Sequence, residues 1–319
     1  IYAFSFLTAP ITNEKETLAL TLLDSVLMET DASPLKYALL QSNLCKEAIS
    51  FIDTDLSEMP WILVCKGCQG GIKNELLKVI SKTLVDLSKN KISKKLIEAS
   101  LHQLEFARSE IRAEGVPYGL TLFMRSALAK QHGANAENSL LIHTLFNELK
   151  QKLENDNFLP SLIEKYILAN PHALYLDMVP DKTLLAKEDT EEKINLEKIQ
   201  QKLTKKEIEE IKKQKVDLEK YHDFMEKQSI DCLPKIKIDD IPKKIKYYPL
   251  TKHQENGLNV YHHDVFTNNI LYVNLTFEIP SLSDEELKIL PLFSQLLTEL
   301  GCSDRDYKTN LEYINTYTG

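Results

Sequence analysis

Over the first 180 positions, segments with the alternating pattern of strands are interspersed with segments that have the hydrophobic period of helices. Tyr2–Ala9 is rich in β-favouring residues and is followed by Pro10, which predicts a strand that ends there. Asn13 and Glu16 have the spacing of a helix cap, and the residues after them place apolar side chains on one helical face. That face carries Leu20, Leu23, Leu27 and Met28. The chain is therefore expected to open with a strand that leads into an amphipathic helix.

Further predicted elements follow in mixed order. Pro34 is typical of the first residue of a helix, and Pro60 separates two apolar stretches, EAISFIDTDL and WILVCKGC, that predict paired antiparallel strands. Helices are predicted over Lys73–Leu87, over Lys94–Ile111 and around LLIHTLFNELKQKL and PSLIEKYIL, before a strand at ALYLDMV. This order predicts an α+β fold, a layered αβ domain with a largely antiparallel sheet, and a domain boundary near Pro180.

The composition changes sharply from Leu184 to Gln228, where Lys, Glu, Gln, Ile and Leu dominate and neither Gly nor Pro occurs. Thr204 and Glu207 have the spacing of a capping box, which predicts two helices arranged as an antiparallel hairpin. The apolar positions expected to pack one arm on the other are Ile194, Ile199, Leu203, Ile208, Ile211 and Leu218. The alternative interpretation is a solvated spacer, because runs of charge usually face water.

A second mixed segment begins after Pro242. The stretches LNVYHHDV and ILYVNLTFEI predict paired strands, and Ser283 with Glu286 predicts a capped helix after them. Leu18, Leu23 and Leu27 have counterparts at Leu287, Leu292 and Leu296, about 270 positions later. We therefore expect the start of a partial second αβ domain that repeats the first thirty residues.

Composition and charge narrow the class of protein. Of the 319 residues, 43% are hydrophobic, and the net charge is −8, so general binding to nucleic acid is disfavoured. No apolar run reaches the roughly 20 residues that span a bilayer, and no signal peptide is evident. Five scattered cysteines fit a soluble protein in a reducing compartment, either the cytoplasm or an organelle matrix. Because the chain starts at Ile1 rather than Met, we expect it to be part of a longer protein.

The stretch HQLEF, which begins at His102, has the first letters of an inverted zinc-protease motif, His-x-x-Glu-His. Phe106 occupies the place of the second His. His102 and Glu105 supply at most two ligands, whereas a catalytic zinc site needs three from the protein. The favoured interpretation is a helix whose apolar residues pack against a sheet.

Two other groups of candidate ligands are also incomplete. Cys65 and Cys68 form a CxxC pair within a predicted strand, where no helix N-terminus stabilises a thiolate, so structural thiols are favoured over a redox centre. His262 and His263 are adjacent, and a strand directs neighbouring side chains to opposite faces. The sequence therefore assigns no catalytic residue and no metal ligand to this chain.

Three stretches carry a resemblance to a known family: ETDASPLKYALLQSNLCKEA, HQLEFARSEIRAEGVPYGLTLFMRSAL and NPHALYLDMVPDKTL. Together with FTNNILYVNLTFEIPSLSDEELKILPLFSQLLTELG, they resemble the presequence protease branch of the pitrilysin or insulinase-type zinc metallopeptidases. The resemblance implies a second, non-catalytic αβ domain over 1–182, a helical hairpin linker over 183–242 and the truncated start of a third αβ domain over 243–319. It also places the HxxEH motif and the zinc in a domain upstream of Ile1.

Two functions follow from this resemblance. The first is the non-catalytic middle section of a zinc metallopeptidase that degrades peptides in a closed chamber, in which case this chain is inactive alone. Peptides or unfolded segments would then reach the chain only through the intact enzyme and bind partly by strand addition. The alternative is a non-catalytic scaffold or interaction protein of the same fold.

Overall fold

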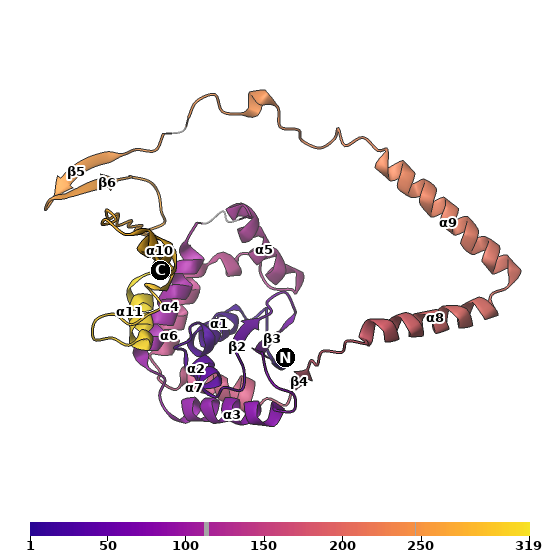
Figure 1. Cartoon of the computed structure of the whole chain (residues 1–319), viewed down its shortest axis with the longest axis horizontal. Coiled ribbons are helices and arrows are strands. Elements are labelled where there is room, and N and C mark those ends of the chain that lie inside the picture. The colour runs from indigo at the N-terminus through magenta and orange to yellow at the C-terminus, as the bar shows by residue number, and fades with distance from the viewer. Residues whose placement is uncertain (112–114, 246) are drawn as a thin grey trace. The chain divides into compact units, whose positions relative to one another are not determined.

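The structure, a computed structural model, describes residues 1–111, 115–245 and 247–319 (Figure 1). The chain divides into two compact units, one formed by Ile1–Val179 with Phe266–Gly319, and the other by Pro180–Val265. No helix among the described residues combines the length and the apolar content needed to cross a membrane.

The first unit is built on a four-stranded sheet in the order β2-β3-β1-β4. Its strands are β1 (Tyr2–Pro10), β2 (Glu47–Ile52), β3 (Glu58–Lys66) and β4 (Ala173–Asp177). Every pairing is antiparallel, and Phe4 of β1 faces Leu63 of β3 on one side and Tyr175 of β4 on the other. The predicted α+β class with an antiparallel sheet is confirmed.

Alternation along β1 and β3 directs one set of side chains into the core. Tyr2, Phe4 and Phe6 are buried, as are the β3 residues on the same face of the sheet. Those β3 residues are Met59, Trp61, Leu63 and Cys65. Because successive side chains of a strand point to opposite faces, this pattern fixes which face of the sheet the helices cover.

Most of the chain between β1 and β4 is helical. They are α1 (Glu14–Met28), α2 (Pro34–Gln41), α3 (Lys73–Lys89), α4 (Lys94–Ser109), α5 (Tyr118–Gln131), α6 (Ile142–Leu153), α7 (Phe158–Ile163) and the π-helical turn Glu164–Leu168, with a 3-10 turn at Asn138–Leu140 besides. Helix α1 is the most buried of these, and it contacts α2, α4, α6, α7 and β2. The predicted cap is present, since the Glu16 backbone N–H donates to Asn13 Oδ1 at 3.3 Å.

One polar side chain of α1 bonds to the sheet from within this core. Asp24 Oδ1 accepts hydrogen bonds from Ser50 Oγ at 2.5 Å and from Trp61 Nε1 at 2.6 Å. Burial raises the pKa of Asp24, although both hydrogen bonds oppose that shift. The pair of donors fixes α1 across β2 and β3, because a buried indole N–H needs an acceptor.

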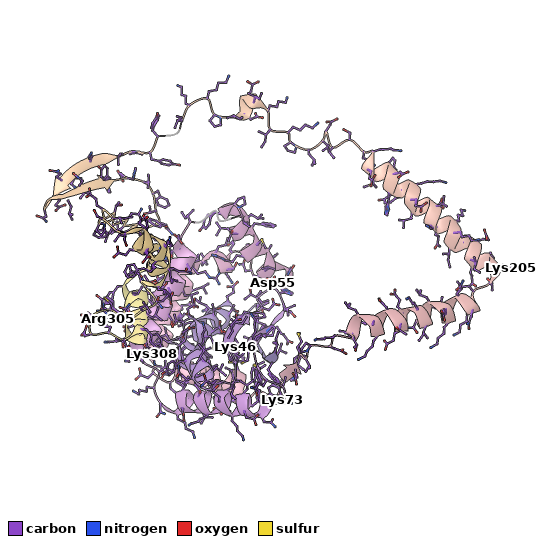
Figure 2. All side chains as sticks on the ribbon, in the orientation of Figure 1. Lys46, Asp55, Lys73, Lys205, Arg305 and Lys308 are labelled. Carbon is purple, nitrogen blue, oxygen red and sulfur yellow. The ribbon has the colours of Figure 1, made fainter. Side chains whose placement is uncertain are left out.

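The second unit contains α8 (Leu184–Lys202) and α9 (Lys205–Glu226). The break between them is as predicted, because Thr204 and Glu207 form a capping box, and Lys205 begins the second helix (Figure 2). The predicted packing of the two arms is wrong for this structure. Ile194, Ile199, Ile211 and Leu218 are between 44% and 56% exposed. The seven polar residues from Lys187 to Lys193 interrupt the apolar face of α8, so no continuous seam is available.

The predicted strand pair after position 250 is also wrong in part. LNVYH forms β6 (Leu258–His262), but it pairs with β5 (Thr251–Glu255) rather than with ILYVNLTFEI. Asn256 and Gly257, with φ of 50° and 82°, make the tight turn between the two strands. ILYVNLTFEI is not a strand, because within the described part of the chain no other strand bonds to it and its apolar side chains are exposed.

Residues 266–319 contact the sheet domain through α4. Helix α10 (Asp284–Leu296) begins at the predicted capping box of Ser283 and Glu286, and α11 (Tyr307–Tyr317) lies against α4 (Figure 1). Lys308 of α11 lies over the ring of Tyr37 in α2, 4.7 Å from its centroid (Figure 2). The proposed repeat of the first thirty residues stays a prediction, since the helix is present and the strand before it is not.

Asp24 gives the stability of the fold a pH dependence of known sign. Its raised pKa means that folding favours the protonated carboxyl. Its stabilising contribution is therefore complete below the unfolded pKa of about 3.9 and is lost as pH rises through the folded pKa. Asp24→Asn keeps the acceptor oxygen, so urea unfolding should show the wild type losing stability relative to this variant from about pH 4 upward.

Trp61, the single tryptophan, reports this unfolding by fluorescence. Asp86→Asn, at an exposed position of α3, is the matched control and should not alter the pH profile. Asp24→Ala leaves the indole N–H without its acceptor and should lower the free energy of unfolding by about 1–3 kcal/mol. Parallel pH profiles for the wild type and Asp24→Asn would show that Asp24 does not titrate as described.

Candidate functional site

The HQLEF stretch lies on α4, and its polar residues are engaged in contacts other than metal binding. Lys150 Nζ donates to both carboxylate oxygens of Glu105, at 3.0 and 2.8 Å, while His102 is exposed. Throughout the described residues, no three His, Cys, Asp or Glu side chains group closely enough to hold a metal ion. The residues at HQLEF therefore do not fit a zinc site.

The same stretch forms the contact with α11. Gln103 Nε2 donates to the carbonyl oxygen of Asn315 at 2.9 Å and also to that of Thr318. These carbonyls belong to the last turn of α11 and the residue after it, where the helix itself supplies no partner. The ring of Phe106 also packs against Gly319, so closely that a Cβ added to this glycine would lie 2.5 Å from the ring. The predicted packing of this helix against a sheet is wrong, because α4 packs against the helices α11, α1 and α6 instead.

The CxxC pair lies at the end of β3. Cys65 is buried in the core, and Cys68 is half-buried with its thiol directed at the Cys65 carbonyl oxygen, 3.4 Å away. A hydrogen bond with Cys45 and burial raise the pKa of Cys65, and burial raises that of Cys68. Gly67, with φ of 66°, turns the chain where a Cβ would come within 2.8 Å of Lys46. The pair therefore ends a strand and begins no helix.

His262 and His263 do not converge on one site. His262 is the last residue of β6, and His263 Nδ1 lies 2.8 Å from the carbonyl oxygen of Pro249. Both side chains are exposed. The expectation that the two lie in one strand and face opposite ways is not met, because β6 ends at His262 and His263 lies outside it.

The feature best suited to binding another polypeptide is the edge strand β4. It pairs with β1 on one side, and the sheet ends there among the described residues. Leu174 is 67% exposed and Leu176 49%, so apolar side chains flank the unpaired backbone groups. An open edge of this kind can accept an extended peptide as a further strand.

Two protein-family models match the chain. The family described as "Peptidase M16 inactive domain" matches residues 1–104, and the family of segments associated with subfamily C of peptidase M16 matches residues 178–319. The two matches occur in chain order, with the sheet domain first and the helical segment second. The chain belongs to subfamily C of the M16 peptidases. The resemblance drawn from the residues is confirmed.

Individual relatives match along nearly the whole chain. Presequence protease 1, chloroplastic/mitochondrial, from Arabidopsis thaliana is 30% identical over 95% of the chain, which covers 28% of that protein. Protein HypA from Clostridium perfringens is 28% identical over 100% of the chain and 33% of its own length. The mitochondrial presequence protease of Xenopus laevis is 27% identical over 99% of the chain and 30% of its own length. The chain thus spans about a third of the curated relatives it matches.

The peptidase M16 inactive domain from Pseudomonas fluorescens matches 57% of this chain and 42% of its own, with a TM-score of 0.39 and 13% identity.

Two groups of buried polar residues were not predicted from the sequence. No hydrogen bond was predicted for Asp24, which lies within an apolar helix. A lone carboxylate among apolar residues is nevertheless a sequence signal of a buried hydrogen bond. No role was predicted for Arg108 and Arg125. Their signal was residue type, since almost all basic residues of this chain are lysine, and arginine is the residue preferred at buried ionic sites.

The geometry of α4 predicts that this chain holds no stoichiometric zinc and cleaves no peptide by itself. Metal analysis of the purified chain should find well under one zinc per molecule, and His102→Ala should leave that value unchanged. Glu105→Gln is the companion variant, and it should cost only the exposed contact with Lys150. One tightly bound zinc per chain, lost on replacing His102, would contradict this account.

The thiols should react in the order of their exposure. Cys232 and Cys302 are exposed, whereas Cys45 and Cys65 are buried. A short pulse of iodoacetamide on the native chain should therefore label Cys232 and Cys302 and leave Cys65 unlabelled until urea is added, as peptide mass mapping would show. Rapid, reversible formation of a Cys65–Cys68 disulfide in the native protein would be the opposite result.

Proposed function

We propose that this chain is the non-catalytic middle section of a presequence-protease-like zinc metallopeptidase. The observation that carries the proposal is the order of the two family matches, an inactive peptidase domain over residues 1–104, which hold β1, β2 and β3, and a peptidase-associated segment over residues 178–319, which hold the helical arms. The curated relatives named as presequence proteases match the chain almost from end to end. The chain spans about a third of them, so catalysis belongs to the rest of the protein in this proposal.

The domain division proposed here follows the resemblance. Residues 1–182 form the second αβ domain of the peptidase, residues 183–242 form the helical linker, and residues 243–319 begin the third αβ domain. The β-favouring composition of ILYVNLTFEI supports the last assignment, because such a segment forms a strand when another strand pairs with it, and its apolar side chains are left exposed here.

In this proposal the sheet domain contributes one wall of a chamber and a place for substrate to bind. The open edge of β4 offers unpaired backbone groups to an extended peptide, and Leu174 and Leu176 offer apolar contacts beside them. Binding through main-chain hydrogen bonds tolerates many sequences, which suits a peptidase that acts on varied peptides. Substrates would be peptides or unfolded segments, bound before they reach the catalytic domain.

The arms α8 and α9 serve as the joint between the halves of the peptidase. Each is a regular helix, and the turn at Leu203 and Thr204 separates them. Each helix is rigid, and the chain between them has no helical hydrogen bonds, so bending concentrates at this turn. The joint would set how far the halves part when a peptide enters.

This role predicts a separation of peptide entry from bond cleavage. In the full-length protein, insertion of Gly-Ser-Gly after Leu203 removes the rigid connection to the capping box of α9. We expect kcat/KM for a long unstructured peptide to change several-fold, while cleavage of a short fluorogenic peptide changes by less than about twofold. Both rates are measured with purified full-length protein loaded with zinc.

The control carries the same insertion after Gly133, in the turn that follows α5. It should leave both rates unchanged. If the Leu203 insertion changed both rates by the same factor, or changed neither, the joint would be refuted. A full-length protein without zinc and without peptidase activity would refute the peptidase proposal itself and favour a scaffold of the same fold.

A further inference from the structure

A small apolar cavity is lined mainly by residues of α1, α4, α5 and α6. Its volume is about 130 Å³. Leu18, Leu128 and Phe146 are among the apolar residues that line it, and Arg108, Arg125 and Glu14 are the charged ones. Thr54, in the loop beside Asp55 (Figure 2), lies at its margin. A cavity of about 150 Å³ lined by Leu, Ile and Phe holds a molecule the size of benzene.

The two arginines have no counterion in the part of the chain that the structure describes. Neither Arg108 nor Arg125 forms an ion pair there, and Nη1 of Arg125 is buried without a hydrogen-bond partner. Burial lowers the pKa of Arg108, and so does the positive charge of Arg125. Two guanidinium groups that repel each other beside apolar walls raise the free energy of the folded state until an anion joins them.

Glu14 does not neutralise this pair. Its Oε1 is buried without a hydrogen-bond partner, and burial raises its pKa with no opposing contribution from either arginine. A guanidinium within a few ångströms would instead lower the pKa of the carboxyl. Glu14 lines the same cavity but forms no ion pair with either arginine among the described residues, and in its neutral form it can donate a hydrogen bond to a ligand oxygen.

We propose that this cavity binds a carboxylate attached to a branched aliphatic group, with Arg108 and Arg125 holding the carboxylate and the apolar walls holding the aliphatic group. The fork of an arginine matches the two oxygens of a carboxylate. Phosphate fits less well, because it would bring a larger charge and further oxygens beside the apolar walls of Leu18, Leu128 and Phe146. The volume admits a group of leucine size, which is carried by the last residue of a peptide or by a free branched acid.

This site does not depend on the proposed role of the chain in a peptidase. It lies among four helices of the sheet domain, and β4 and the α8–α9 arms contribute no residue to it. A pocket that selects a terminal carboxylate would nevertheless give such a protein a means of recognising peptide ends.

Isothermal titration of the 319-residue chain tests the proposal with three probes. They are N-acetyl-alanyl-leucine with a free carboxylate, the same dipeptide as its C-terminal amide, and 4-methylpentanoate. We expect the free acid to bind at least tenfold more tightly than the amide. Arg125→Gln and Arg108→Gln should each weaken binding of the acid by tenfold or more, and Arg125→Lys should weaken it by less.

Lys130→Gln, which removes an exposed cation from the same helix as Arg125, is the matched control and should bind the acid as the wild type does. If 4-methylpentanoate binds and the dipeptide acid does not, the carboxylate site stands and its ligand is a free acid. Equal binding of acid and amide, tighter binding of inorganic phosphate than of either acid, or unchanged affinity in both arginine-to-glutamine variants would overturn the proposal. So would the absence of binding by every probe at millimolar concentration.

The unliganded variants provide a second readout. Because each arginine-to-glutamine change removes a repelling charge, neither should melt at a lower temperature than the wild type. A lower melting temperature in both variants would show that the arginines already have partners, and that result would also contradict the proposal.

Discussion

Pairing of β1 on both of its edges is the constraint on which the rest of the first unit depends. β3 bonds to one edge and β4 to the other, although β4 follows β1 by more than 160 positions in the chain. The contact is reinforced beyond the ladder, since Leu7 N–H donates to the His172 carbonyl at 3.1 Å and Asn170 Nδ2 donates to the Leu7 carbonyl at 2.8 Å. The chain from β3 to β4, which forms α3 to α7, therefore begins and ends at the same sheet.

Packing and hydrogen bonds occupy the side chains of the sheet and of α4. The face of the sheet is occupied by aliphatic and aromatic side chains and by the bonds of Asp24, so its residues are committed to packing. The helix that carries HQLEF uses Gln103 and Phe106 to contact α11 and Glu105 to contact Lys150. What such a domain can offer a substrate is backbone at an open edge and shape in its cavities, which are the two features proposed here as binding sites.

The sequence predicted elements well where local signals decide the outcome. The caps at Asn13, Thr204 and Ser283 are all present, because a side chain that bonds its own backbone acts over three residues only. The strand assigned to ILYVNLTFEI failed because a strand also needs a bonded neighbour, which composition does not supply. The Asn256–Gly257 pair is a local sequence signal for a hairpin turn, and it would have predicted the pairing of β5 with β6. The arginine pair could not be predicted, since Arg108 and Arg125 meet only through the packing of α4 and α5.

Hydrogen–deuterium exchange of the 319-residue chain is the most direct test of this account, because it reports the stability of each backbone segment separately. The account predicts that amides of β1 exchange last, that those of β3 and the β1-bonded edge of β4 are also strongly protected, and that α8 and α9 exchange early as exposed helices. Protection of α8 and α9 equal to that of β1, or loss of protection in β4 while β1 and β3 remain protected, would contradict it.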